Sequence, residues 1–172
     1  MKPSWAYSGH VSDAELVVDF LNTVDHGAQT DVLDDPWAWE AWLATHELTG
    51  SPDVRALRTA LRVAVGDPRD HADPGTPGEA SASVTVELAG GTPRLVATDV
   101  AGAVLTAASR LAVRGEWERV KICPADDCRW AFYDRSRNHS RTWCSMQVCG
   151  NREKARAWRR RSEEQLRDRV DQ

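Results

Sequence analysis

The four cysteines of this 172-residue chain fall into two matched pairs near its C-terminal end. Four residues separate Cys123 from Cys128, fifteen residues follow, and four residues again separate Cys144 from Cys149. Zn²⁺ is bound tetrahedrally by soft ligands at roughly 2.3 Å, and two short loops that face each other can supply four thiolates. The spacing therefore predicts one Zn²⁺ ion held by all four cysteines.

The alternatives for these cysteines are burial as small apolar residues or redox chemistry. Buried cysteines usually scatter among core positions, whereas these form two equal pairs, so a metal site is favoured. Four thiolates also complete the coordination shell and leave no position for a catalytic water. We therefore expect a structural ion whose binding helps to fold this segment. We expect no enzymatic activity, because the sequence shows neither a nucleophile and base pair nor a phosphate-binding glycine loop; an enzyme using the region of Asp25 and His26 stays open as a third alternative.

Charge is divided unevenly along the chain. Residues 1–120 carry 9 Lys and Arg against 18 Asp and Glu, a net charge of −9, whereas residues 121–161 carry 11 against 4, a net charge of +7. A basic end on an acidic body suggests a polyanionic partner. We place a domain boundary here, with an acidic domain over residues 1–120 and a basic, cysteine-containing domain over residues 121–172.

The segment after Cys149 predicts a basic helix. Residues 152–169 contain strong helix formers and no Gly or Pro, and Asn151 is a candidate N-cap. At 3.6 residues per turn, one face carries Arg152, Arg156 and Arg159, with Arg160 at its edge. We expect an adjacent apolar stripe to dock on the zinc-binding segment; it consists of Ala155, Trp158 and Leu166.

Nucleic acid is the polyanion that we expect this end to bind, because guanidinium groups neutralise phosphates and can read guanine edges in a major groove. The candidate contacts lie between the cysteine pairs and on the helix: Arg135, Arg137, Arg141, Arg152, Lys154, Arg156, Arg159 and Arg160. Two alternatives stay open. The arginines could pair with acidic residues of their own helix, or they could dock on an acidic protein surface, either of this chain or of a protein partner.

The first 120 residues predict a mainly helical domain with one β-hairpin. Helix starts are indicated by a capping box at Ser12 and Glu15, by Asp35 before Pro36, by Ser51 before Pro52, and by Asp99. The expected apolar stripe of the third helix is Val54, Leu57, Leu61 and Val65, and a tryptophan cluster at residues 37, 39 and 42 is expected in the core. Residues 83–88 and 94–98 predict the hairpin. Residues 66–82, rich in Gly, Pro and Asp, predict a mobile loop.

Four polar residues follow or end the first helix: Asn22, Thr23, Asp25 and His26. They could line a pocket for a small-molecule effector. We favour the simpler interpretation that Asn22 and Thr23 bond to nearby backbone at the helix end. The N-terminal residues lack the apolar core of a signal peptide, and no stretch approaches the roughly 18 apolar residues that cross a bilayer. We therefore expect a cytoplasmic protein that does not associate with membranes.

Several motifs around the cysteines carry a family resemblance. They are FYDRSRN at residues 132–138, RTWCSM at residues 141–146 and CGNR at residues 149–152. Together they resemble the CGNR zinc-finger family of bacterial proteins. Upstream, LVVDFLNTVD at residues 16–25 and the WAWEAWL helix are similar to the ABATE domain that accompanies this finger. The resemblance implies a stress-linked transcription regulator with the finger as its DNA-binding module. The alternative protein partner would then belong to the transcription machinery.

Overall fold

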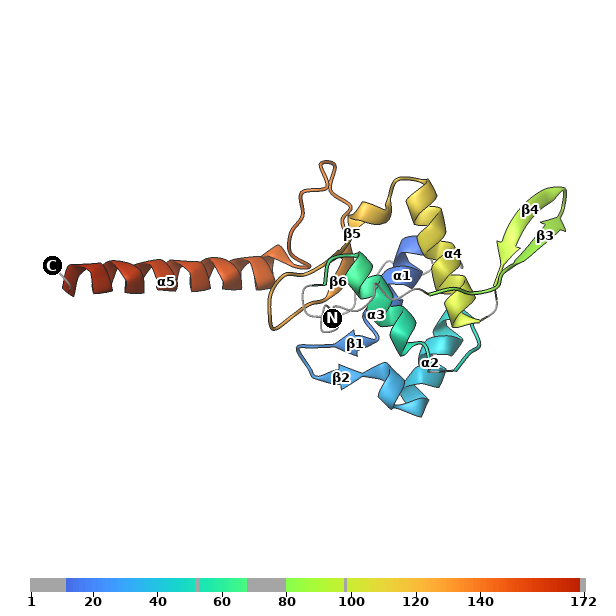
Figure 1. Ribbon diagram of the computed structural model, residues 1–172, viewed down its shortest axis with the longest axis horizontal. Coiled ribbons are helices and arrows are strands. Elements are labelled where there is room, and N and C mark those ends of the chain that lie inside the picture. The colour runs from blue at the N-terminus through green and yellow to red at the C-terminus, as the bar shows by residue number, and fades with distance from the viewer. Residues whose placement is uncertain (1–11, 52, 68–79, 98, 171–172) are drawn as a thin grey trace.

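The computed structural model describes residues 12–51, 53–67, 80–97 and 99–170, the last five for their backbone alone. About half of these residues are helical, and the strands form three small antiparallel pairs (Figure 1). The helices are α1 (Asp13–Leu21), α2 (Pro36–His46), α3 (Arg55–Ala64), α4 (Val100–Val113) and α5 (Asn151–Val170). The strand pairs are β1 (Val24–Asp25) with β2 (Thr30–Asp31), β3 (Thr85–Ala89) with β4 (Thr92–Val96), and β5 (Val120–Ile122) with β6 (Ala131–Tyr133). The predicted loop at residues 66–82 lies outside the described residues except at its two ends.

Side-chain caps begin three of the helices where the sequence predicts them. Ser12 Oγ accepts a hydrogen bond from the Glu15 N–H, and the Glu15 carboxylate accepts one from the Ser12 N–H. Asp35 caps α2 and Asp99 caps α4 in the same way, each through a carboxylate oxygen. The third helix differs from the prediction, because α3 begins only at Arg55 and has no side-chain cap.

The core lies between α1 and α4, with α2 and α3 packed beside them. Phe20 on α1 and Leu111 on α4 are almost fully buried, and so is Trp39 on α2. Trp42 stacks on Trp39 with ring centroids 5.2 Å apart. The third tryptophan of the predicted cluster does not join them, because Trp37 is 86% exposed.

The cysteine-containing segment enters this same core through the β5–β6 hairpin. Val120, Ile122 and Ala131 are buried in one cluster with the helix side chains. A second, smaller cluster lies just beyond them and contains the cysteines, Ala125, Phe132 and Trp143. The metal-binding loops therefore rest directly on the helical body.

The predicted β-hairpin is confirmed as β3 and β4. Gly90 and Gly91 join the strands with φ angles of 59° and 79°, a left-handed pair that suits glycine in a two-residue turn. The hairpin projects from the body instead of packing on it (Figure 1). The β1–β2 and β5–β6 pairs were not predicted, because their strands are only two and three residues long.

Helix α5 extends away from the body at the opposite end from this hairpin (Figure 1). The prediction that an apolar stripe of α5 docks on the cysteine segment is wrong for Ala155 and Trp158. Both are exposed, Trp158 to 65%; the side chain of Leu166 is outside the described set. None of the described helices combines the length and the apolar character needed to cross a membrane.

Candidate metal centre and basic helix

The four cysteine sulfurs converge on one point. All four Sγ atoms lie within 4.8 Å of one another, and none is in a disulfide. Cys144 Sγ lies 3.5 Å from Cys128 Sγ and 3.6 Å from Cys149 Sγ. Sulfurs bound tetrahedrally to one Zn²⁺ ion would be about 3.8 Å apart. The arrangement therefore fits a single tetrahedral ion.

The first cysteine pair lies in the loop that joins β5 to β6. The N–H of Cys123 donates to the carbonyl of Trp130 at 2.9 Å, which continues the pairing of β5 and β6 by one residue into the loop. Within the loop, the N–H groups of Cys128 and Arg129 both donate to the carbonyl of Ala125. Arg129 takes a left-handed conformation with φ 53°, a strained state for a residue with a side chain. Surrounding contacts must hold it there.

The second cysteine pair straddles the start of the C-terminal helical segment. Ser145 caps a π-helical turn, Met146–Gly150, by accepting from the N–H of Val148, and Cys149 lies inside this turn. The helical segment thus begins at Met146, and the prediction of Asn151 as the N-cap is wrong. A Cβ at Gly150 would lie 2.4 Å from Met146 Sδ and 3.1 Å from Trp143 Cδ1, so the absence of a side chain lets these two residues close over the turn.

Four neighbouring thiols oppose their joint ionisation. Burial and nearby sulfurs raise the pKa of the Cys144 thiol far above its usual range and that of Cys149 to about 11. The pKa of Cys123 is lowered: burial acts to raise it, but hydrogen bonds from the backbone N–H groups of Cys144 and Ala125 and from the thiols of Cys144 and Cys149 together outweigh this effect. A bound cation would remove the opposition, because cysteines bind metal as thiolates and release their protons.

Asp127 connects the first cysteine loop to the base of α5. Its carboxylate pairs with Arg152 at 2.7 Å and with Arg156 at 2.9 Å. Arg152 also approaches Cys149 Sγ at 3.6 Å, and Arg156 pairs with Glu153 at 2.5 Å. The hydrogen bond from Arg156 is the main cause that lowers the pKa of Asp127. Two predicted DNA contacts, Arg152 and Arg156, are therefore engaged within the protein.

Of the other residues predicted to contact DNA, some bond to groups within the protein and the rest are exposed without an ion pair. Arg141 lies over the Phe132 ring and donates to the backbone carbonyls of Trp143 and Cys144, so it braces its own loop. Arg135 pairs with Glu15 at the surface, 3.2 Å apart. The exposed cations without an ion pair to another described residue are Arg137, Lys154, Arg159 and Arg160, together with Arg161, which the sequence prediction omitted.

The loop between the cysteine pairs is organised by a carboxylate that sequence analysis missed. Asp134 is fully buried and accepts from Lys121 Nζ at 2.8 Å and from the N–H groups of Ser136 and Arg141 at 2.9 Å. Burial alone would raise the pKa of Asp134, but these donors hold it well below its usual range. Hydrogen bonds to this buried carboxylate therefore hold the loop in its conformation.

Of the four residues considered for an effector pocket, Asn22 and His26 contact the cysteine segment, whereas Thr23 and Asp25 bond within the N-terminal body. The Asn22 amide pairs with both backbone groups of Ala131, at 2.9 and 2.7 Å. Thr23 Oγ1 donates to the Phe20 carbonyl at 2.8 Å, as favoured from the sequence. Asp25 accepts from the N–H groups of the following turn, at Gly27 and Ala28. His26 Nδ1 lies 3.3 Å from Arg129 Nη1.

A shallow groove of about 370 Å³ lies beside the sulfurs, between the turn after β1 and the start of the helical segment. Of the four candidate residues, only Asp25 lines it, together with Cys128, Cys144 and Cys149. Ligand binding by the other three stays a prediction that these contacts do not support.

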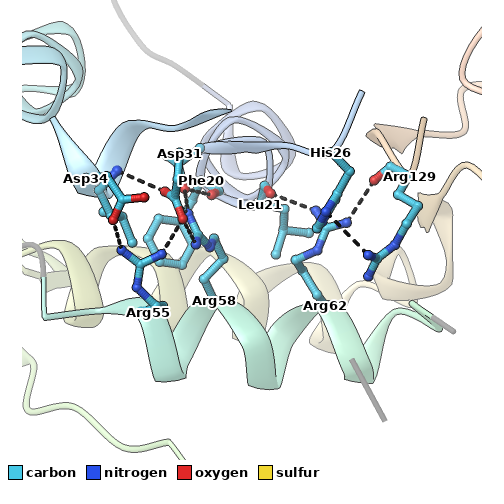
Figure 2. A network of polar contacts seen from close by, with 11 residues as sticks. Phe20, Leu21, His26, Asp31, Asp34, Arg55, Arg58, Arg62 and Arg129 are labelled. Atoms are coloured by element: carbon cyan, nitrogen blue, oxygen red, sulfur yellow. Dashed lines mark hydrogen bonds and ion pairs between the residues drawn. The ribbon is translucent and has the colours of Figure 1, made fainter. Parts of the chain in front are cut away.

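Three arginines of α3 form a polar network that the sequence prediction missed (Figure 2). Arg58 makes two hydrogen bonds to Asp31, at 2.7 and 2.5 Å, and Arg55 bridges Asp31 and Asp34. Burial acts to raise the pKa of Asp31, but the bonds from Arg58 lower it to about 2. The predicted stripe of α3 is confirmed: Leu57 and Leu61 are buried, and Val54 and Val65 pack against the core, yet Arg58 is buried beside them.

The third arginine, Arg62, joins α3 to the first cysteine loop. Arg62 Nε and Arg129 Nε each donate to the Asp67 carboxylate at 2.8 Å. Arg62 also donates to the carbonyls of Leu21 and Arg129, both at 2.8 Å. These contacts hold the strained residue that directly follows Cys128. The only sequence signal was the spacing of residues 55, 58 and 62, which places three arginines on one helix face.

Comparison with known families agrees with the resemblance seen in the sequence. The ABATE model, described as "Putative stress-induced transcription regulator", matches residues 14–121. The CGNR zinc finger model matches residues 119–162. No curated protein matches the chain. The two matches overlap at residues 119–121, where β5 begins; this strand is buried in the helical core and leads directly into the first cysteine loop.

Proposed function

Because the chain belongs to the ABATE family, we propose that it is a transcription regulator that binds DNA through the basic helix α5. In this proposal one Zn²⁺ ion is held by Cys123, Cys128, Cys144 and Cys149. The ion fixes the base of the helix and takes no part in catalysis, because four thiolates fill its coordination shell. The observation that carries the proposal is the projection of α5 from the body with exposed cations along its length (Figure 1).

The cations of α5 have two roles. Arg152 and Arg156 hold the helix against Asp127. Arg159 and Arg160 lie one turn further along the same side, beyond the reach of that carboxylate. Guanidinium groups placed in this way can neutralise backbone phosphates, and a helix can carry them into a major groove. This division of roles differs from the sequence prediction, in which all four arginines contact DNA.

The salt dependence of DNA binding tests the proposal. Fluorescence anisotropy of a labelled duplex should show binding whose log K falls linearly with log salt, with a slope of about −0.9 per phosphate contact. Replacing Arg159 and Arg160 with Ala should make this slope shallower by about 2. The matched control is Arg94→Ala, which removes an exposed arginine from the distant hairpin. No binding at about 50 mM salt, or equal effects of both variants, would refute the proposal.

A protein partner is the second candidate, favoured by Trp158. This side chain is 65% exposed beside the arginines, and Trp with Arg is the composition of protein-interface hot spots. The two candidates predict different effects of nuclease. A protein that copurifies with the chain after nuclease digestion, and is lost in Trp158→Ala, would support the partner. Loss of all copurifying protein after digestion would favour DNA.

A further inference from the structure

The β3–β4 hairpin has an apolar face that the body leaves exposed. The strand register pairs Val86 with Leu95 and Leu88 with Pro93, so these four side chains share one face. Val86 is 67% exposed and Leu88 75%, and the hairpin projects from the body (Figure 1), which it contacts on the β4 side through a hydrogen bond from Arg110 of α4 to the Leu95 carbonyl. A two-stranded hairpin alone is marginally stable in water, and contiguous exposed apolar side chains mark contact surfaces.

The two outer edges of the hairpin differ in their capacity to pair. Pro93 lies within β4 and has no N–H, which makes the outer edge of β4 a poor template for another strand. Strand β3 contains no proline and alternates apolar with polar residues. Among the described strands it pairs only with β4. The outer edge of β3 is therefore the one open to strand addition.

Pro93 also shows which backbone groups of β3 point outward. Proline is tolerated where a cross-strand pair makes no hydrogen bonds, so Leu88 and Pro93 form a non-hydrogen-bonded pair. The two kinds of pair alternate along an antiparallel ladder, so Val86 and Leu88 occupy equivalent positions. The N–H and C=O groups of Val86 and Leu88 therefore point away from β4, toward the free edge, and Val84, which directly precedes β3, continues this alternation when the strand is extended by one residue.

We propose that a second copy of this chain binds this edge, with the two β3 strands antiparallel about a two-fold axis at Val86. In this register Val86 faces the partner's Val86, and Val84 faces the partner's Leu88. On the other face, Thr85 lies opposite the partner's Glu87. The side-chain pairs on the Val86 face are then all apolar, and on the other face no two like charges lie directly opposite each other.

Other registers lose this complementarity. An axis at Glu87 places two carboxylates directly opposite each other, which is destabilising. An axis at Thr85 places Leu88 opposite Ala82, three residues before β3 begins, whereas the axis at Val86 needs the strand to extend by only one residue, to Val84. A shift by a single residue sets the apolar face of one protomer against the polar face of the other. The sequence of β3 is thus self-complementary in one register, as a two-fold interface requires.

The charge and position of the hairpin favour this partner. Glu87 of β3 and Arg94 of β4 form an ion pair across the polar face, 3.3 Å apart, so each hairpin carries no net charge although the body is acidic. The hairpin and α5 project from opposite ends of the body (Figure 1). The dimer goes beyond the proposed function and does not depend on it, and it leaves both basic helices free.

Sedimentation equilibrium of the full, zinc-loaded chain tests the dimer. We expect a dimer for the wild type, and for Val86→Lys a dissociation constant more than tenfold higher, because the two lysines oppose each other at the axis. The matched control is Thr85→Lys, on the other face of the same strand. Its lysine faces the partner's Glu87, so the dimer should persist. A monomeric wild type, or equal weakening by both variants, would overturn the proposal.

Cysteine cross-linking tests the register separately. Directly opposite residues of a hydrogen-bonded pair have Cα atoms about 5.5 Å apart, which a disulfide can bridge. Val86→Cys should therefore form a covalent dimer on mild oxidation, with the bond located in the hairpin by peptide mass spectrometry. In Glu87→Cys the two Cα atoms would be about 8 Å apart, too far for a disulfide. Cross-linking of Glu87→Cys but not of Val86→Cys would overturn the register.

Discussion

Replacing Asp67 with Asn should destabilise the whole body and loosen the metal site. The guanidinium groups of Arg62 and Arg129, on residues only 1% and 5% exposed, share the Asp67 carboxylate. Asn keeps the shape but removes the negative charge, which leaves two buried cations without it. Removing one partner of a buried ion pair costs about 3–5 kcal/mol. At roughly 2–4 °C per kcal/mol for a chain of this size, Tm should fall by about 6–20 °C.

The same substitution should speed metal release, because Arg129 directly follows Cys128 and is held in a strained conformation by this network. Thermal unfolding by calorimetry measures the first effect, and transfer of zinc to a chromophoric chelator measures the second. Glu87→Gln serves as the control, since it breaks an exposed pair with Arg94 that should contribute less than about 1 kcal/mol. An Asp67→Asn variant with Tm within about 2 °C of the wild type and an unchanged release rate would refute the reasoning.

Three further outcomes follow from the site. Chelation of the metal should lower both Tm and the helical circular dichroism signal, because the turn at Met146–Gly150 contains a metal ligand and metal binding contributes folding free energy; an unchanged spectrum would contradict this. Asp31 has a folded pKa of about 2 against an ordinary 3.8, so its ionised form should add about 2 kcal/mol of stability above pH 4, lost as pH falls toward 2. Urea unfolding at pH 6 and pH 3 measures about half of this loss, and Asp31→Asn should reduce it. Asp127→Asn releases Arg152, whereas Arg156 keeps its pair with Glu153, so the salt dependence of the proposed DNA binding should steepen by about 1 in slope; a slope equal to that of the wild type would argue against the release of Arg152.

Features that depend on neighbouring residues could be predicted from the sequence. Ser12, Asp35 and Asp99 cap helices through N–H groups two or three residues ahead, so the signal and the structure lie in one short segment. The pairing of cysteines within each loop is local in the same sense. Convergence of the two loops followed from the chemistry of one tetrahedral ion, which needs four ligands.

The roles of individual arginines could not be predicted, because their partners lie far away in the sequence. Arg129 meets Asp67 across 62 residues, and Arg156 meets Asp127 across 29. In the sequence, Arg156 and Arg159 look alike, and only the folded position of Asp127 separates a positioning arginine from an exposed one. Helical periodicity likewise assigned Trp158 to an apolar stripe, but periodicity does not show whether any surface covers that stripe.

Because α5 is long and is attached at the metal site, a small change in its angle there would move its far end by a large distance. It contains 20 residues, and at 1.5 Å per residue its far end lies roughly 30 Å from its base. A rotation of about 10° at the pivot would move that end by roughly 5 Å, more than the 3.4 Å between successive base pairs. If α5 binds DNA as proposed, small angular changes around Cys149 and Asp127 would therefore decide which base pairs the outer half of the helix reaches.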